Sequence, residues 1–170
     1  MSRTAICEQV DHRLGRVESV LDVGCGDGAL VRCLAERVAR EAIGIDISGS
    51  VLSETRLSKD CGQHLARCTK EDAHALRSFP EGRFDAVVAV HALHELRDPM
   101  GALHEAKRVL KPGGVVLIAD FTEGHEGERI WGERYYAVEQ IQTMLTSSGF
   151  EQIDIRQLPG EHFVYALGRK

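Results

Sequence analysis

The chain lacks the features of membrane, secreted and nucleic-acid-binding proteins. No apolar run approaches the roughly 18 residues that span a bilayer, and residues 1–18 carry charges throughout, without the apolar segment of a signal peptide. Basic side chains are not in excess either: the net charge is −5, whereas nucleic-acid binding is usually driven by neutralising phosphates. These absences predict a cytoplasmic protein with no membrane and no nucleic-acid partner.

The cysteines lack the spacing of a disulfide framework or a zinc ribbon. Their number, five, is odd, and no C-x-x-C pair occurs. Reduced thiols that pack as small buried hydrophobes fit a cytoplasmic chain, and no metal is expected. The five positions are Cys7, Cys25, Cys33, Cys61 and Cys68.

Repeats, low-complexity tracts and linkers are also absent, so residues 1–170 are expected to form a single domain. Apolar periodicity predicts helices at 6–17, 30–38, 48–57 (capped by Ser48), 103–110 and 138–145, with an irregular segment at 122–136. Strands are expected at 19–24, 42–46, 64–68, 84–90, 115–121 and, as a hairpin around a Pro-Gly turn, within 150–169. This alternation predicts an α/β fold, with a seven-stranded, mostly parallel sheet, a C-terminal antiparallel hairpin and helices on both faces.

The stretch VLDVGCGDGAL places three glycines, Gly24, Gly26 and Gly28, directly after the first predicted strand. Such glycines let a backbone approach a ligand closely, although they can also serve only a tight turn. Ligands bind at the carboxyl ends of the strands in sheets of this kind, so the glycines lie where a ligand is expected. The stretch also satisfies the G-x-G-x-x-A form of the dinucleotide fingerprint, and Asp46 supplies an acid at the end of the second strand.

The charges beside the glycines argue against a dinucleotide and therefore against an NAD-dependent oxidoreductase. Asp22 and Asp27 flank the position of the pyrophosphate, and no Lys or Arg lies between Asp22 and Arg32. Carboxylates and phosphates repel at close range. A ligand with an ammonium group and no phosphate gains from the carboxylates instead, and S-adenosylmethionine (SAM) is such a ligand. Asp27 can alternatively stabilise the N-terminus of the following helix.

Six motifs follow one another in the order and spacing of a known family: LDVGCGDG, GIDIS, EDAHAL, FDAVVAVHALHELRDP, LHEAKRVLKPGGVVLIADF and RYYAVEQIQTMLTSSGFEQIDI. On these motifs the chain, from about residue 18 to its end, resembles the class I SAM-dependent methyltransferases of the small methyltransferase-domain type. The resemblance implies a Rossmann-like fold, SAM as cofactor and S-adenosylhomocysteine (SAH) as product.

The resemblance also implies cofactor contacts, residue by residue. Asp22 is expected to face the methionine ammonium, Asp46 the ribose hydroxyls and Asp72 the adenine amino group. Ile47 is expected to pack on adenine, and a backbone carbonyl at His91 to meet the ammonium. Asp46 and Ser48 can alternatively mark only the start of a helix. The full implied set is Asp22, Gly24, Cys25, Gly26, Asp27, Gly28, Asp46, Ile47, Ser48, Asp72, Ala73 and His91.

Methyl transfer requires an oriented nucleophile, and it requires a base only where the nucleophile arrives protonated. His91 and His94 in VHALHEL are the catalytic candidates, because histidine titrates near neutrality; alternatively, they only position the methionine arm. Long irregular segments tend to bind ligands. Residues 122–136 therefore supply the substrate-pocket candidates Trp131, Arg134, Tyr135 and Tyr136, of which Trp131 and one tyrosine can instead simply cover the sheet.

We expect a SAM-dependent methyltransferase that acts on a small molecule, with protein as the next choice of acceptor. VHALHE differs from the Asn/Asp-Pro-Pro-aromatic tetrad of enzymes that methylate bases or Gln. Residues 1–18 allow an N-terminal lid of one helix, which leaves room for a partner subunit, and a monomer or a homodimer is expected. The alternative is a catalytically inert SAM-binding subunit that supports or regulates a partner protein.

Overall fold

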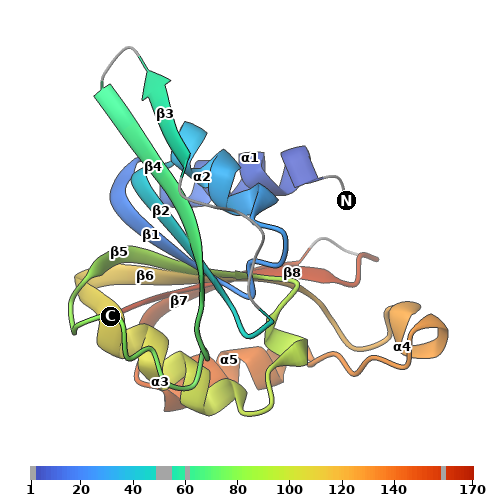
Figure 1. Cartoon of the computed structure of the whole chain (residues 1–170). Coiled ribbons are helices and arrows are strands. Elements are labelled where there is room, and N and C mark those ends of the chain that lie inside the picture. The colour runs from blue at the N-terminus through green and yellow to red at the C-terminus, as the bar shows by residue number, and fades with distance from the viewer. Residues whose placement is uncertain (1–2, 49–54, 60–61, 158–159) are drawn as a thin grey trace.

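The structure is a computed structural model that describes residues 3–48, 55–59, 62–157 and 160–170. Within these residues the chain forms one eight-stranded sheet, in the order β3-β4-β2-β1-β5-β6-β8-β7 (Figure 1). The strands are β1 (Val17–Val23), β2 (Ala39–Asp46), β3 (Thr55–Lys59), β4 (Gly62–Lys70), β5 (Phe84–Val90), β6 (Leu110–Phe121), β7 (Glu151–Gln157) and β8 (Phe163–Arg169). The helices are α1 (Arg3–Leu14), α2 (Ala29–Arg37), α3 (Pro99–Val109), α4 (Gly127–Ile130) and α5 (Val138–Ser147), with a 3-10 turn, η1 (Leu93–Glu95).

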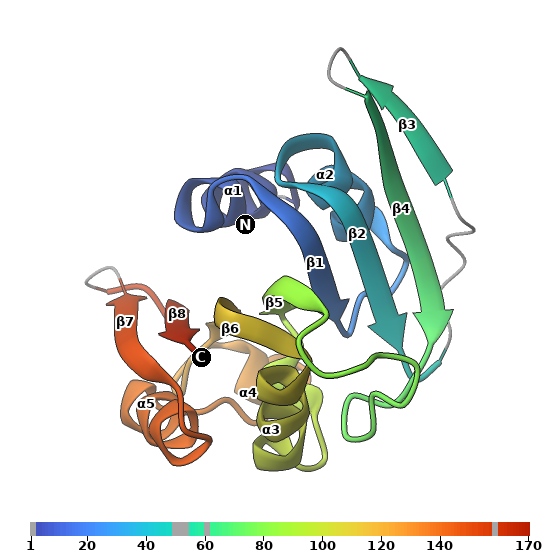
Figure 2. The same cartoon turned by 90° about the vertical axis from the view of Figure 1, so that its left-hand side faces the viewer.

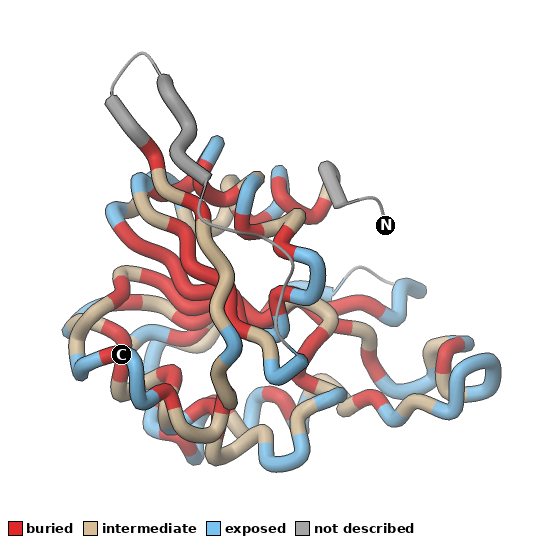
Figure 3. Tube along the Cα trace, viewed as in Figure 1, coloured by how far each residue is buried: buried red, intermediate tan, exposed pale blue. Residues whose placement is uncertain are grey.

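Helices cover both faces of the sheet, with α1 and α2 on one side and α3 and α5 on the other (Figure 2). The central strands are buried on both faces, as the apolar run within FDAVVAV at 84–90 predicts. Successive residues of β1 point to opposite faces of the sheet. Leu21 packs into the hydrophobic cluster beneath α3 and α5, and Val20 packs into the cluster beneath α1 and α2. Figure 3 shows the buried residues concentrated along the middle of the sheet. The predicted Rossmann-like α/β fold is confirmed.

The order of the strands creates a crevice at one edge of the sheet. Five neighbouring strands, β4, β2, β1, β5 and β6, run parallel, so their carboxyl ends share that edge. From β1 the chain builds outward to β2 and β4 on one side and then to β5 and β6 on the other, which makes β1 the point where the order reverses. The loops after β1, β2 and β5 therefore meet there. The antiparallel pair β7 and β8 confirms the predicted hairpin.

The segment after β2 differs from the prediction. The helix expected at 48–57 is wrong for its last residues, because 55–59 form β3, which pairs antiparallel with β4. Residues 49–54 lie outside the described residues. Ser48 caps no helix in the described structure, since its N–H and hydroxyl both donate to the carboxylate of Asp46. Pairing with the otherwise open edge of β4 gives an eighth strand in addition to the seven predicted ones.

The N-terminal helix ends three residues earlier than predicted and packs on the sheet. Gly15, with a φ of 63°, ends α1 after Leu14, so Val17 lies in β1 rather than in the helix. Ile6 and Val10 are buried in the cluster shared with α2. The lid function of residues 1–18 stays a prediction. None of the helices in the described part of the chain is long and apolar enough to cross a membrane.

The prediction of reduced cysteines is wrong for two of them. Cys7 of α1 and Cys33 of α2 form a disulfide across the contact between these helices, with their Cα atoms 6.4 Å apart. The sequence did not reveal this pair, because a separation of 26 residues does not show which helix faces pack together. Cys25 and Cys68 are not in disulfides, and Cys61 lies outside the described residues. The cysteines therefore no longer argue for a reducing compartment.

Residues 122–136 leave the end of β6, and Thr122 bridges to Tyr136 where the segment returns. The segment is irregular, as predicted, apart from the single turn of α4, which lies away from the sheet (Figure 1). Ile130 and Trp131 beside this turn are 49% and 60% exposed. The alternative in which Trp131 covers the sheet is therefore wrong.

Gly44 of β2 lies where the sheet, α2 and the glycine turn meet. A Cβ at this position would lie 2.5 Å from the Val31 Cγ2 and 2.6 Å from the Cys25 Cβ. We expect Gly44→Ala to lower the free energy of unfolding by about 1–3 kcal/mol, because this well-packed site has no room for a methyl group. Denaturant titration measures the change, and an unaltered free energy would show that α2 and the glycine turn can move apart freely.

Candidate functional site

The glycine turn between β1 and α2 has a backbone that only glycine adopts readily. Gly24, Gly26 and Gly28 have φ values of 73°, 51° and 74°. A Cβ on Gly24 would lie 2.7 Å from the Cβ of Ala92, so this glycine lets the loops after β1 and β5 touch. No heavy atom of the described structure lies within 4 Å of a Cβ built on Gly26. The middle of the turn therefore borders open space.

Asp46, at the end of β2, holds the turn in place. Its Oδ2 accepts from the N–H of Gly26 at 3.0 Å, and its Oδ1 accepts from the N–H of Ser48 at 2.9 Å. The hydrogen bond from the Ser48 hydroxyl is the main cause that lowers the pKa of Asp46, and the two backbone N–H groups add to it. Asp46 is therefore an ionised acceptor at the edge of the crevice.

Asp22 is a buried acid with an unsatisfied oxygen. It is 2% exposed, and its Oδ2 has no hydrogen-bond partner among the described residues. Burial is the main cause that raises its pKa well above 3.8, and the neighbouring Cys68 and Asp46 raise it further. Asp22 and Cys68 lie on either side of Gly44 in the sheet register. An ammonium group of a ligand would supply the missing partner, which fits the methionine end of SAM.

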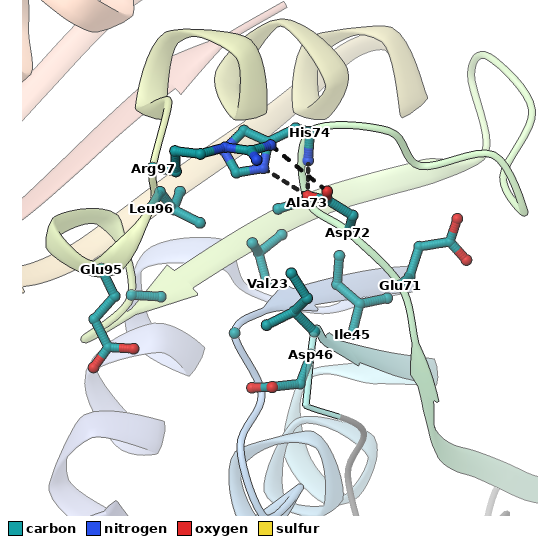
Figure 4. Close-up of a pocket in the computed structure, with 13 residues that line it drawn as sticks. Val23, Ile45, Asp46, Glu71, Asp72, Ala73, His74, Glu95, Leu96 and Arg97 are labelled. Carbon is teal, nitrogen blue, oxygen red and sulfur yellow. Dashed lines mark hydrogen bonds and ion pairs between the residues drawn. The ribbon is translucent and has the colours of Figure 1, made fainter.

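A cavity of about 230 Å³ lies between the ends of β1 and β2 and the loop after β5 (Figure 4). At its far end the Asp72 Oδ1 accepts from the His74 N–H at 2.9 Å, and Arg97 approaches the Asp72 Oδ2 at 3.9 Å. These contacts, the backbone N–H of His74 first, lower the pKa of Asp72. Ile47 also lines the cavity and is 69% exposed. An exposed apolar side chain beside an ionised acceptor suits the adenine end of the same ligand.

The structure brings only some of the predicted cofactor residues to this cavity. Those that line it are Gly24, Asp46, Ile47, Asp72 and Ala73. Cys25, Gly26, Gly28 and Ser48 belong to the surrounding turns, and His91 lines a neighbouring recess. The Asp27 Oδ1 accepts from the Ala29 N–H at 3.1 Å, which agrees with its alternative role at the start of α2. Sequence reasoning missed the lining residues Val23, Ile45, Glu71, His74, Ala92, Glu95, Leu96 and Arg97.

His91 and His94 occupy different environments in the loop after β5. His91 has a φ of 52°, and its ring lies against those of Phe121 and Phe163. Burial is the main cause that lowers the pKa of His91. The His94 side chain is 6% exposed, and its Nδ1 lies 2.8 Å from the Oδ1 of Asp120. A non-glycine residue with positive φ beside a buried His–Asp pair is typical of functional sites.

A second recess, of about 320 Å³, lies beside His94 and is lined by His91, His94, Glu95, Phe121, Trp131, Glu133 and Tyr135. Rings form much of its wall: Tyr135 meets His94 edge-on with centroids 4.7 Å apart, and Phe121 is itself stacked on His125 at 3.8 Å. Trp131 and Tyr135 thus lie together at this recess, and their role in binding a substrate stays a prediction. Arg134 and Tyr136 instead line a separate hollow of about 550 Å³, which His94 and Tyr135 also border.

The sheet is Rossmann-like and has a glycine turn after its first strand. Asp46 ends the neighbouring strand β2, and Asp72 follows β4. This arrangement is that of a class I SAM-dependent methyltransferase domain. The family profile described as a methyltransferase domain matches residues 21–118, more than half of the 170 residues, and the chain belongs to this family. Its cofactor is SAM.

Relatives and fold neighbours agree with this assignment. The chain is 37% identical over 121 residues to a demethylmenaquinone methyltransferase of Tropheryma whipplei, covering 71% of this chain and 48% of that protein. It is 38% identical over 114 residues to a ubiquinone biosynthesis O-methyltransferase of Alkalilimnicola ehrlichii, covering 62% and 43%. The chain thus spans less than half the length of these curated relatives.

A solved structure of a Haemonchus contortus phosphoethanolamine N-methyltransferase, in complex with phosphomonomethylethanolamine and SAH, is similar to this fold. Its TM-score is 0.74 at 17% identity, with 98% of this chain and 53% of that chain covered. At this identity the likeness concerns the fold alone.

Proposed function

We propose that this domain transfers the methyl group of SAM to a small-molecule acceptor that is bound beside His94. The unsatisfied oxygen of Asp22 carries the proposal, because it suits the methionine ammonium. Asp22 comes just before the glycine turn, whose Gly24 lies against Ala92 of the loop that bears His94, which supports a methyl group near His94. Glu95 lines both the cofactor cavity and the recess, so the two spaces adjoin. The curated relatives are named for quinone methylation, which supports an aromatic acceptor.

Bound SAM supplies a sulfonium that activates its methyl carbon toward a nucleophile. The residues of the chain hold this cofactor and exclude water from the site. Asp22 pairs with the ammonium, Asp46 accepts from the ribose hydroxyls, and Ile47 and Asp72 receive adenine. The rings of the recess orient the acceptor, which is the main requirement of this chemistry.

Label transfer tests the proposal against the alternative of an inert SAM-binding subunit. The protein is incubated with methyl-labelled SAM and a series of hydroquinones, catechols and aromatic amines, and the products are identified by mass. Labelled product supports the enzyme. Tight SAH binding with no label on any acceptor would instead favour a subunit that supports a partner.

Asp46→Ala is expected to weaken SAH binding by about ten- to a hundredfold and to leave the fold intact. The variant loses hydrogen bonds to a charged acceptor, which are worth about 1.5–3 kcal/mol. Titration calorimetry measures the affinity. Asp154→Ala is the matched control, because this acid lies on β7 and pairs with Arg156 at the surface. If the two variants bind SAH equally well, Asp46 does not contact the cofactor.

A further inference from the structure

The end of β6 presents a buried carboxylate to the loop after β5. Asp120 is 1% exposed. Its Oδ1 accepts from the N–H of Phe121 at 2.8 Å, and its Oδ2 from the N–H of His94 at 3.2 Å. The His94 Nδ1 lies 2.8 Å from Oδ1 and 3.0 Å from Oδ2. Three donors therefore converge on one carboxylate, which fixes the ring of His94.

This contact also fixes the tautomer of the neutral ring. A carboxylate only accepts, so the proton of neutral His94 lies on Nδ1 and the lone pair on Nε2. The described contacts of Nε2 are with carboxylates beyond hydrogen-bond distance, Glu95 at 3.9 Å and Glu133 at 4.0 Å. Glu95 and Glu133, the carboxylates nearest Nε2, both line the recess, as does His94 itself, so we infer that Nε2 is a proton acceptor on the recess side of the ring.

The recess selects the kind of acceptor that can meet this nitrogen. Phe121, Trp131 and Tyr135 offer ring surfaces for an aromatic molecule. Glu95 and Glu133 would repel a carboxylate or a phosphate, and they would hold an aliphatic amine in its protonated, unreactive form. A neutral aromatic hydroxyl avoids both problems and can donate its proton to Nε2.

We propose that His94 is the catalytic base, that Asp120 is its positioning residue, and that together they deprotonate an aromatic hydroxyl bound in the recess. The inference rests on the proposed function and deepens it. The hydroxyl oxygen bonds to the methyl carbon while the sulfur–carbon bond breaks, and the proton passes to Nε2 of His94. The sulfur becomes neutral, and no oxidant or reductant is required.

The charges around His94 determine the pH dependence of the step. Burial lowers its pKa, but the hydrogen bond to Asp120 and the charges of Asp120, Glu95 and Glu133 outweigh burial and raise the pKa above 6.5. His91 and the ring of Tyr135 are its other titratable neighbours. A base must be neutral, so kcat is expected to fall as pH decreases through this raised pKa.

The test compares His94→Gln and Asp120→Asn with the wild type, using hydroquinone and SAM. We expect kcat to fall about 10²- to 10⁴-fold in His94→Gln, as for loss of a general base. In Asp120→Asn we expect a smaller loss and a lower His94 pKa, measured by NMR on the protein without cofactor. SAH affinity should not change, since neither residue lines the cofactor cavity. His104→Gln, on the exposed side of α3, is the matched control.

The outcomes separate this inference from the proposed function. A wild type that methylates no acceptor contradicts the proposed function, while the NMR titration still tests the pair. If the wild type methylates hydroquinone and the kcat of His94→Gln equals that of His104→Gln, His94 is not the catalytic base. A His94 pKa unchanged by Asp120→Asn overturns the positioning role. Methylation of an aromatic amine but not of hydroquinone overturns the acceptor class.

Discussion

Gly26→Val is expected to abolish SAM binding, with at least a hundredfold loss of affinity, in a domain that stays folded. The φ of 51° at Gly26 makes valine cost about 1–3 kcal/mol in backbone strain. No heavy atom lies within 4 Å of a Cβ built there, so the side chain meets no other part of the described structure. It projects instead into the space above the glycine turn, where the methionine arm is expected. Calorimetry with SAH measures the loss.

The chain offers a matched control for this substitution. Gly113 also has positive φ, 76°, and open space around a built Cβ, but it lies at the opposite end of the parallel sheet. Gly113→Val therefore introduces comparable strain without touching the cofactor. If both variants bind SAH equally well, Gly26 serves only the turn.

Asp22→Asn is expected to make the protein more stable and a weaker binder of SAM. A buried carboxylate with an unsatisfied oxygen costs free energy, and a neutral amide of the same shape removes its charge. We expect a gain of about 1–3 kcal/mol in the free energy of unfolding at pH 7. Loss of the ammonium partner should weaken SAH binding by about ten- to a hundredfold. Denaturant titration and calorimetry measure the two changes.

The gain in stability should depend on pH. Because the pKa of Asp22 is raised in the folded state, the folded chain binds more protons than the unfolded chain between pH 3.8 and that raised pKa. The free energy of unfolding of the wild type therefore falls as pH rises through this window. Asp22→Asn has no titrating group at this position, so it does not show this decrease. The difference between variant and wild type should shrink toward acid. A wild type more stable than Asp22→Asn at pH 7 would contradict the account of this site.

The parts of the fold that were predicted correctly are those with a local sequence signature. β5 is buried on both faces, so it carries an unbroken apolar run at residues 86–90 that indicates a strand. The glycines after β1 have a backbone geometry that other residues rarely adopt, so their spacing indicates the turn. Asp46 and Asp72 follow parallel strands, and the carboxyl ends of such strands share one edge.

The features that were missed depend on contacts between distant segments. β3 forms because the edge of β4 is open, which the local pattern at residues 55–59 does not show. Asp120 lies 26 residues from His94, and its sequence context indicates only the end of an apolar strand. The pairing of β5 with β6 is what brings the two residues together. The Cys7–Cys33 disulfide likewise depends on how α1 packs against α2.

A structure of the protein with SAH and hydroquinone is the decisive test of an acceptor bound beside His94. We expect the ammonium at Asp22, the ribose at Asp46 and the sulfur facing the recess. We also expect a hydroxyl oxygen of hydroquinone about 3 Å from the Nε2 of His94. Hydroquinone bound instead in the hollow beside Arg134, or a sulfur turned away from His94, would contradict the account.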